Sequence, residues 1–450
     1  MRTLFLTPMT DKAPKLEGPL GLMYIQAVLD KEGYESKIVD IYDSYDEIRQ
    51  IINSYNPNIV GISCFTNYRK SSFELARVAK ETNPSIIVVM GGPHATYLWE
   101  QMLRNIPEVD IIVKGEGEIT YLELVKALEN KTPLDKVDGI AFRKNNELYS
   151  TKERGLIQNL DSIPFPSYRD IDLSKYSNRI HVHSSRGCFN SCTYCATFWK
   201  NHWRGRSAKN VVDEIEWLVK EKGLKYLYFS DDIFTVDKQR AIDICKMLID
   251  RKIDIGWVTE TRVDSVSYEV LYWMKKAGCS ILQFGVESGS PTILKNIKKN
   301  ITLEQIRNAF KLCKEVGLKA QAFIMVGNQG ETWETVRETE RLLDEIKPDV
   351  LSVAIAGIFP NTELYRIAKE KGVIGDDFWL TNKTILKYTG EHTMGELLNM
   401  RVHITRHFYR TKGRFAFIKY VLTMVRKKPT LLTDHLKAYL GIKIDNEERN

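Results

Sequence analysis

Hydrophobic residues between positions 1 and about 130 occur in short runs separated by longer amphipathic stretches. The β-rich runs predict strands, and the stretches with apolar residues at helical spacing predict helices. Alternation of this kind is typical of a doubly wound α/β fold, in which helices cover both faces of a parallel sheet. Such sheets bind ligands beyond the carboxyl ends of their strands. The expected strands are Arg2–Thr7, Glu35–Ile41, Ile59–Ser63, Ile86–Met90 and Asp110–Val113, and the expected helices are Leu20–Lys31, Ser44–Ser54, Ser71–Thr82 and one starting near Thr120.

The pattern changes twice after residue 130. Residues 131–178 lack a regular period and contain three prolines, so they predict a linker that carries a short hairpin. Alternation resumes over residues 179–378, where six strand-and-helix units predict a partial (β/α)6 barrel of the TIM type. Residues 379–450 predict a helical region with basic flanks. The expected barrel strands are Ile180–Ser184, Tyr226–Ser230, Ile255–Val258, Ile281–Gly285, Lys319–Val326 and Val350–Ala354, with helices such as Ala208–Glu221, Lys238–Arg251 and Leu303–Val316.

Composition indicates a folded protein of two or three domains, because the 450 residues are 43% hydrophobic and 27% charged. No apolar run approaches the roughly 18 residues of a membrane-spanning helix. Pro8 and Asp11 interrupt the N-terminus before a signal-peptide core forms. These features predict a cytoplasmic protein.

The net charge of +7 comes from the last fifty residues, which hold 12 Lys and Arg against 4 Asp and Glu. Within this tail, Phe415, Ile418, Leu422 and Val425 fall at helical spacing on one face, with basic residues beside them. We expect this face to pack on the barrel. The alternative is peripheral contact with an anionic membrane, which would point to a lipid-like substrate.

Three of the seven cysteines, Cys188, Cys192 and Cys195, lie within eight positions of one another, directly after the first barrel strand. The other four are scattered in apolar surroundings and are expected to be core residues. A zinc site would need a fourth ligand, and no second CxxC-like pair lies nearby in the sequence. Three closely spaced thiolates suit three irons of a cubane iron–sulfur cluster, whose fourth iron stays open to a chelating ligand.

This CxxxCxxC loop, with Tyr194 before its last cysteine, resembles the radical S-adenosylmethionine (SAM) superfamily. The resemblance implies that the amino and carboxylate groups of SAM bind the open iron of a [4Fe–4S] cluster, with Tyr194 among the residues near SAM. Reduction by an external donor of the flavodoxin or ferredoxin type would then cleave the sulfonium and release a 5′-deoxyadenosyl radical.

Charged residues at the ends of later barrel strands fit the same resemblance. Asp231 and Asp232 follow the second strand, and a carboxylate there can accept a hydrogen bond from the ammonium of SAM. Arg262 follows the third strand, where it can pair with the SAM carboxylate. Glu287 ends the fourth strand and resembles the acid that the family places near the ribose. The alternatives are a helix N-cap for either aspartate and a surface ion pair for Arg262.

Glycine-rich turns at the strand ends of residues 1–130 closely resemble the cobalamin-binding domain that is fused to some radical SAM enzymes, a Rossmann-like sheet. Glycines let the backbone approach a flat corrin closely, and hydroxyls can bond its amide arms. Classical cobalamin domains have a cobalt-binding histidine in the first loop, but the loop Thr7–Gly21 has none. We therefore expect no histidine on cobalt, and the alternative role of His94 is a turn residue. The candidate cobalamin contacts are Leu20, Gly21, Ser63, Thr66, Gly91, Gly92, His94, Gly115 and Glu116.

The resemblance is strongest to the group that contains the anaerobic magnesium-protoporphyrin monomethyl ester cyclase and the hopanoid methylase. It implies a cobalamin-dependent radical SAM enzyme, and we expect a methyltransferase that acts on an unactivated carbon of a small-molecule or lipid-like substrate. The first alternative is a cyclisation or rearrangement without methyl transfer.

Two more distant alternatives remain. A tRNA methylthiotransferase needs three further cluster cysteines in its N-terminal domain, and this chain has only Cys64 there, so we expect no nucleic-acid partner. A non-enzymatic corrin-binding protein would not need the Cys188–Cys195 loop.

Overall fold

A computed structural model describes the chain except for residues 10–17, 146, 177–179, 382–386 and 414–450. Contacts divide the chain into two compact units. The first unit consists of Met1–His181 and Arg204–Asn210, and the second unit of Val182–Trp203 and Val211–Asn450. The first boundary lies close to residue 179, where the alternating sequence pattern resumes.

Seven strands form the sheet of the first unit, in the order β2-β1-β3-β4-β5-β6-β7. The first five are parallel, and β6 and β7 are antiparallel to their neighbours. Their bounds are Thr3–Leu6 (β1), Ser36–Val39 (β2), Ile59–Ser63 (β3), Ile87–Gly91 (β4), Ile111–Val113 (β5), Ile140–Lys144 (β6) and Glu147–Ser150 (β7).

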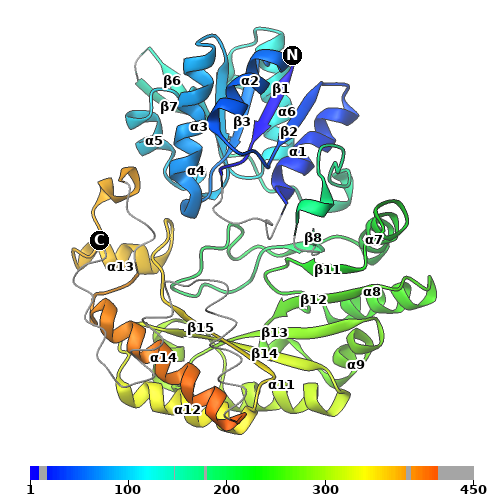
Figure 1. The fold of residues 1–450 in the computed structure, drawn as a ribbon, viewed down its shortest axis with the longest axis vertical. Helices are drawn as coiled ribbons and strands as arrows, with labels where there is room; N and C mark the ends of the chain where they lie inside the picture. The colour runs from blue at the N-terminus through cyan, green and yellow to red at the C-terminus, as the bar shows by residue number, and fades with distance from the viewer. Residues whose placement is uncertain (10–17, 146, 177–179, 382–386, 414–450) are drawn as a thin grey trace. The chain divides into compact units, whose positions relative to one another are not determined.

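Helices cover both faces of this sheet (Figure 1), with α1 packed against α6 and α2 packed against α3. The doubly wound α/β fold expected from the sequence is confirmed. Ser44 caps α2 by accepting a hydrogen bond from the backbone of Glu47, which explains why the helix begins there. The bounds are Leu20–Lys31 (α1), Tyr45–Tyr55 (α2), Arg69–Thr82 (α3), Pro93–Tyr97 (α4), Trp99–Asn105 (α5) and Gly117–Glu129 (α6), with short 3-10 helices at Thr66–Tyr68, Leu134–Lys136, Leu160–Ser162 and Leu173–Lys175.

The segment 131–178, predicted to be a linker, lies within the first unit. Its hairpin is present as β6 and β7, but these strands extend the sheet beside β5 instead of standing apart. The reason is hydrophobic, since Ile140, Ala141 and Phe142 are buried in the packed sheet.

Six strands form the sheet of the second unit, in the order β15-β14-β13-β12-β11-β8 (Figure 1), as expected for a partial (β/α)6 barrel. The pairs from β11 to β15 are parallel. The bounds are Ile180–Val182 (β8), Tyr226–Phe229 (β11), Gly256–Thr261 (β12), Cys279–Glu287 (β13), Lys319–Val326 (β14) and Val350–Ile355 (β15). Two further strands have two residues each, Ser185–Arg186 (β9) in the second unit and Arg204–Gly205 (β10) in the segment that belongs to the first unit.

The helices of the second unit pack against one another in sequence along its sheet. Helix α8 contacts α9, α9 contacts α11, and α11 contacts α12. The last described helix, α14, packs against α12 and β15. The bounds are Ala208–Lys222 (α7), Lys238–Asp250 (α8), Tyr268–Lys276 (α9), Pro291–Asn296 (α10), Leu303–Val316 (α11), Trp333–Ile346 (α12), Glu363–Glu370 (α13) and Met394–Thr411 (α14), with 3-10 helices at Val263–Ser265 and Asp376–Leu380.

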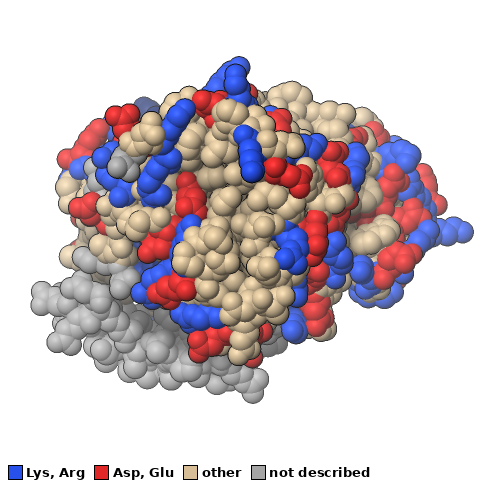
Figure 2. Space-filling model, turned by 90° about the horizontal axis from the view of Figure 1, so that it is seen from above, with Lys and Arg blue, Asp and Glu red and all other residues tan. Residues whose placement is uncertain are grey.

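The basic apolar segment 414–428 lies outside the described residues, so both its packing on the barrel and its membrane contact stay predictions. None of the described helices is long and apolar enough to span a membrane. On the face shown in Figure 2, basic and acidic side chains are interspersed rather than separated, in keeping with the near-neutral charge of the chain before its tail.

Candidate functional site

The three clustered cysteines lie in the loop after β9, within the second unit. Gly187 starts this loop with φ +97°, and a Cβ there would lie 1.8 Å from the His202 carbonyl oxygen, so only glycine fits. The loop donates hydrogen bonds to its own sulfurs. Cys188 Sγ accepts from the backbone N–H of Asn190 at 3.3 Å and from its Nδ2 at 3.5 Å, and Cys195 Sγ accepts from the Thr197 N–H at 3.4 Å.

Electrostatics disfavour charged thiolates in this loop unless cations compensate for them. Burial raises the pKa of Cys195 to about 11 and also raises that of Cys192, although the positive charges of Lys299 and Arg262 partly oppose the effect at Cys192. Bound iron supplies such compensation, because a coordinated thiol is deprotonated.

The donor chemistry of the loop is that of an iron–sulfur cluster, whose irons are held by cysteine thiolates. Among the described residues, no three His, Cys, Asp or Glu side chains form a group that could hold one metal ion. A cubane cluster takes each thiolate on a separate iron and is tuned by hydrogen bonds to sulfur, such as those from Asn190 and Thr197. The loop therefore has the ligand chemistry of a cubane site.

The two aspartates after β11 differ in their surroundings. Asp231 is only 2% exposed and accepts hydrogen bonds from the backbone of Ser184 at 2.7 Å and of Ser185 at 2.9 Å, as well as from the Ser184 hydroxyl. It thus joins the ends of β8 and β11, and burial raises its pKa. Asp232 is exposed and accepts a hydrogen bond from the Thr197 hydroxyl at 2.8 Å, within the cysteine loop. Of the two, Asp232 is the better placed to meet a ligand, and SAM contact stays a prediction for both.

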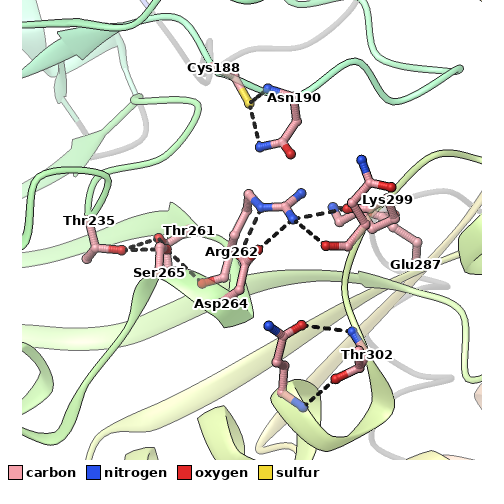
Figure 3. Close-up of polar contacts among 12 residues, drawn as sticks. Cys188, Asn190, Thr235, Thr261, Arg262, Asp264, Ser265, Glu287, Lys299 and Thr302 are labelled. Carbon is pink, nitrogen blue, oxygen red and sulfur yellow. Dashed lines mark hydrogen bonds and ion pairs between the residues drawn. The ribbon is translucent and has the colours of Figure 1, made fainter.

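Arg262 is buried and held in a fixed orientation at the end of β12 (Figure 3). Its Nε and Nη2 bond the Asp264 carboxylate at 2.9 and 2.8 Å, and Nη2 also donates to the Lys299 and Asn300 carbonyls. The ion pair expected as the alternative is present, with Asp264, but it does not lie at the surface, because Arg262 is only 7% exposed. Figure 3 shows the remaining Nη1 on the side of the Cys188–Asn190 turn.

Glu287, at the end of β13, forms a buried ion pair that the sequence does not predict. Its Oε1 lies 2.8 Å from Lys299 Nζ, and the two side chains are 11% and 8% exposed. Lys299 Nζ also lies 3.4 Å from the hydroxyl of Tyr194, in the cysteine loop. Burial and then the Glu287 carboxylate raise the pKa of Tyr194 well above its usual value, so the phenol stays protonated. Tyr194, Glu287 and Lys299 therefore form one polar cluster, in which Glu287 and Lys299 are buried and Tyr194 is partly exposed.

In the first unit, several predicted cobalamin residues lie at the carboxyl edge of the sheet. Ser63 and Gly91 end the neighbouring strands β3 and β4. Gly92 follows with φ +99°, and a Cβ there would meet the Cys64 carbonyl oxygen at 2.9 Å. Cβ atoms added at Gly21 and Gly115 would meet no described atom within 4 Å. These open backbone positions fit the close approach of a flat, bulky group such as a corrin.

Three other predicted cobalamin residues have partners within the first unit. Thr66 and His94 are both buried, with His94 Nδ1 3.2 Å from Thr66 Oγ1. Burial lowers the pKa of His94 to about 3, so the ring is neutral. Glu116 forms a buried ion pair with Arg204 at 2.9 Å and accepts the Ile157 N–H at 2.7 Å. These contacts support the fold, and a cobalamin contact stays a prediction for all three, as it does for Leu20 at the start of α1.

Sequence reasoning missed the buried Lys299 and two exposed aromatic residues near the predicted cobalamin contacts. Lys299 stands in a Lys-Lys pair that reads as surface charge, and its burial gives no signal in the pattern. Phe65 and Tyr68 are 51% and 44% exposed in the loop after β3, although large aromatic residues are usually buried. In the sequence, the only sign of these aromatic residues' exposure was their position between Ser63, a predicted cobalamin contact, and the start of α3.

Comparison with known families places two cofactor domains on the chain. Residues 6–125 match the model of the B12 binding domain, and residues 182–343 match that of the Radical SAM superfamily. The chain is 35% identical over 399 residues to an uncharacterised methyltransferase of Pyrococcus horikoshii, covering 86% of this chain and 87% of the relative.

A second relative is the anaerobic magnesium-protoporphyrin IX monomethyl ester cyclase of Rubrivivax gelatinosus, 30% identical over 462 residues, with 98% of this chain and 82% of the relative covered. The solved structure of the cobalamin-dependent SAM radical enzyme OxsB, with aqua-cobalamin bound, has the same fold. Its TM-score is 0.77 at 20% identity, with 97% of this chain and 72% of that chain covered.

The two relatives cover 86% and 98% of this chain. The cofactors of this family are cobalamin, SAM and a [4Fe–4S] cluster, as the cysteine loop and the glycine-rich sheet edge indicate. The chain belongs to the cobalamin-binding radical SAM enzymes.

Proposed function

We propose that the enzyme is a methyltransferase that transfers a methyl group to an unactivated carbon of a small-molecule substrate. The observation that carries this proposal is the 35% identity over 86% of the chain to a methyltransferase. When bound, the three cofactors supply a radical able to abstract hydrogen from carbon and a transferable methyl group. The electron comes from an external donor of the flavodoxin or ferredoxin type.

The roles of the chain's own residues follow from their surroundings. Cys188, Cys192 and Cys195 would hold the cluster. Arg262, oriented by Asp264, presents a fixed positive charge that suits the carboxylate of SAM. Glu287 and Lys299 are only 9% and 6% exposed, and their burial limits the access of water to that part of the barrel.

The second candidate is a cyclisation or rearrangement that uses the same cofactors without methyl transfer. The cyclase of Rubrivivax gelatinosus favours it, because that relative covers 98% of this chain. The two candidates differ in their products, since only methyl transfer converts SAM into S-adenosylhomocysteine and places the methyl group in the product.

The deciding experiment is an anaerobic incubation of the reduced holoenzyme with methyl-deuterated SAM and a small-molecule cell extract. We expect a labelled product, with S-adenosylhomocysteine and 5′-deoxyadenosine formed in step with it, all measured by mass spectrometry. The Cys188→Ala, Cys192→Ala, Cys195→Ala variant is the control and should give none of the three. Formation of 5′-deoxyadenosine with an unlabelled product would favour cyclisation or rearrangement.

His94 should not bind cobalt, because its ring is buried and bonded to Thr66. We expect cob(II)alamin bound to the full-length protein to show the same electron paramagnetic resonance spectrum in wild type and in His94→Ala. A change in the nitrogen splitting in His94→Ala would show that this histidine reaches the metal.

A further inference from the structure

The segment Ile297–Asn300, between α10 and α11, contacts three separate parts of the SAM site. The Ile297 carbonyl accepts the backbone N–H of Thr193, in the cysteine loop, at 3.1 Å. The carbonyl oxygens of Lys299 and Asn300 accept hydrogen bonds from Arg262 Nη2 at 3.0 and 3.3 Å. Figure 3 shows Arg262 beside Lys299. One short segment therefore supports the cysteine loop and the arginine at the end of β12.

The Lys299 side chain reaches the third part, the end of β13. Its Nζ pairs with Glu287 Oε1 at 2.8 Å and approaches the Tyr194 hydroxyl at 3.4 Å. The pair packs tightly over Gly285, where an added Cβ would lie 2.6 Å from both Glu287 Oε1 and Lys299 Nζ. Even a methyl group at position 285 would displace the pair.

The backbone around this pair adopts an unusual conformation. Glu287 has φ +67°, and Lys298 and Asn300, on either side of Lys299, have φ +54° and +53°. Left-handed conformations are uncommon for residues other than glycine, and they persist where the surrounding contacts enforce them, often at ligand sites. The Lys299–Glu287 pair supplies such a contact for Glu287.

A buried Lys–Glu pair is also a poor means of stabilising a fold, because desolvation of the two charges offsets most of their attraction. Its value here lies in holding the Glu287 carboxyl group in a fixed position, where its oxygens still have acceptor capacity for a hydroxyl or ammonium group of a ligand. SAM carries both kinds of group.

We propose that Lys299 is a positioning residue for SAM, which acts by fixing the carboxylate of Glu287 while its carbonyl orients Arg262. The 297–300 segment thus sets both charged side chains that face the cysteine loop. This inference goes beyond methyl transfer and does not depend on it, because SAM binding is measured without turnover.

The test is a double-mutant cycle on the affinity of the unreduced holoenzyme for SAM, measured by anaerobic equilibrium dialysis with radiolabelled SAM. We expect Lys299→Met and Glu287→Gln each to raise the Kd of SAM about 5- to 100-fold, which lies within the range of coupling between residues of one polar network. In the Glu287→Gln background, Lys299→Met should add less than about twofold, because the group through which it acts is already neutral.

The matched control is the neighbouring Lys298→Met, since Lys298 pairs at the surface with Glu363 and its side chain is 53% exposed. It should leave the Kd of SAM unchanged. Iron content and the spectrum of bound cobalamin are recorded for every variant. The proposal would be overturned if the two substitutions had multiplicative effects on the Kd in the double variant, or if Lys299→Met had no larger effect than Lys298→Met. Loss of iron from Lys299→Met would also overturn it, because Lys299 would then support the cysteine loop rather than SAM.

Discussion

Replacement of Cys188, Cys192 and Cys195 together by alanine should remove all cluster iron and sulfide from the anaerobically purified protein. The reason is that thiolates are the ligands of such clusters, and this loop supplies the three clustered cysteines of the chain. Cobalamin binding should persist, because the glycine-rich sheet edge belongs to the first unit and the cysteines to the second. Iron and sulfide analysis, with the absorption spectra of cluster and corrin, measures both effects.

The control is the double variant Cys245→Ala, Cys313→Ala, which removes two buried thiols from helices α8 and α11 of the same unit. Burial raises the pKa of Cys313 to about 12, so this thiol stays neutral in the core. The control should keep its iron. A triple variant that retained iron, sulfide and a normal cluster spectrum would refute the assignment of the loop.

Acid should destabilise the first unit, and His94→Gln should relieve part of this effect. Burial lowers the pKa of His94 from 6.5 to about 3, so the folded protein keeps the ring neutral where the unfolded chain takes up a proton. The stability that depends on a neutral His94 ring is therefore fully present above pH 6.5 and is lost as the pH falls towards 3. Each pH unit between these values costs about 1.4 kcal/mol.

The measurement is hydrogen exchange of peptides covering β3 and β4 over a urea series, repeated between about pH 7 and pH 4.5. Relative to His94→Gln, wild type should lose about 2.5 kcal/mol of unfolding free energy over this range. His202→Gln, which alters an exposed histidine of the second unit, should follow wild type. Parallel pH profiles for wild type and His94→Gln would show that His94 is protonated as easily in the folded state as in the unfolded state.

Local sequence pattern was sufficient for most of the regular structure. Leu20–Lys31, Ile59–Ser63 and Lys319–Val326 have the bounds predicted for them, because periodicity and short β-branched runs report directly on burial. The segment 131–178 was less predictable. Its assignment to the first unit depends on β6 pairing with β5, and pairing between strands is not encoded in either strand alone.

The candidate site was likewise predictable from local sequence in part only. The cysteine loop and the glycine-rich turns at the strand ends resemble those of known families, and this resemblance predicted both cofactor domains because such motifs are local. The individual roles of Asp231 and Asp232 were not separable in the sequence. Only the structure shows that the first joins two strand ends while the second is exposed beside the cysteine loop.

By itself, then, the sequence determined the α/β fold class and the two cofactor domains and singled out the cysteine loop, since each rests on residues close together in the chain. The tertiary structure alone decided which charges meet. Lys299 lies 12 positions from Glu287 and 105 from Tyr194, and Arg262 is bonded to carbonyls 37 and 38 positions away. A lysine is expected at the surface unless a specific partner compensates for its burial, and folding of β12, β13 and the cysteine loop around the 297–300 segment supplies that partner.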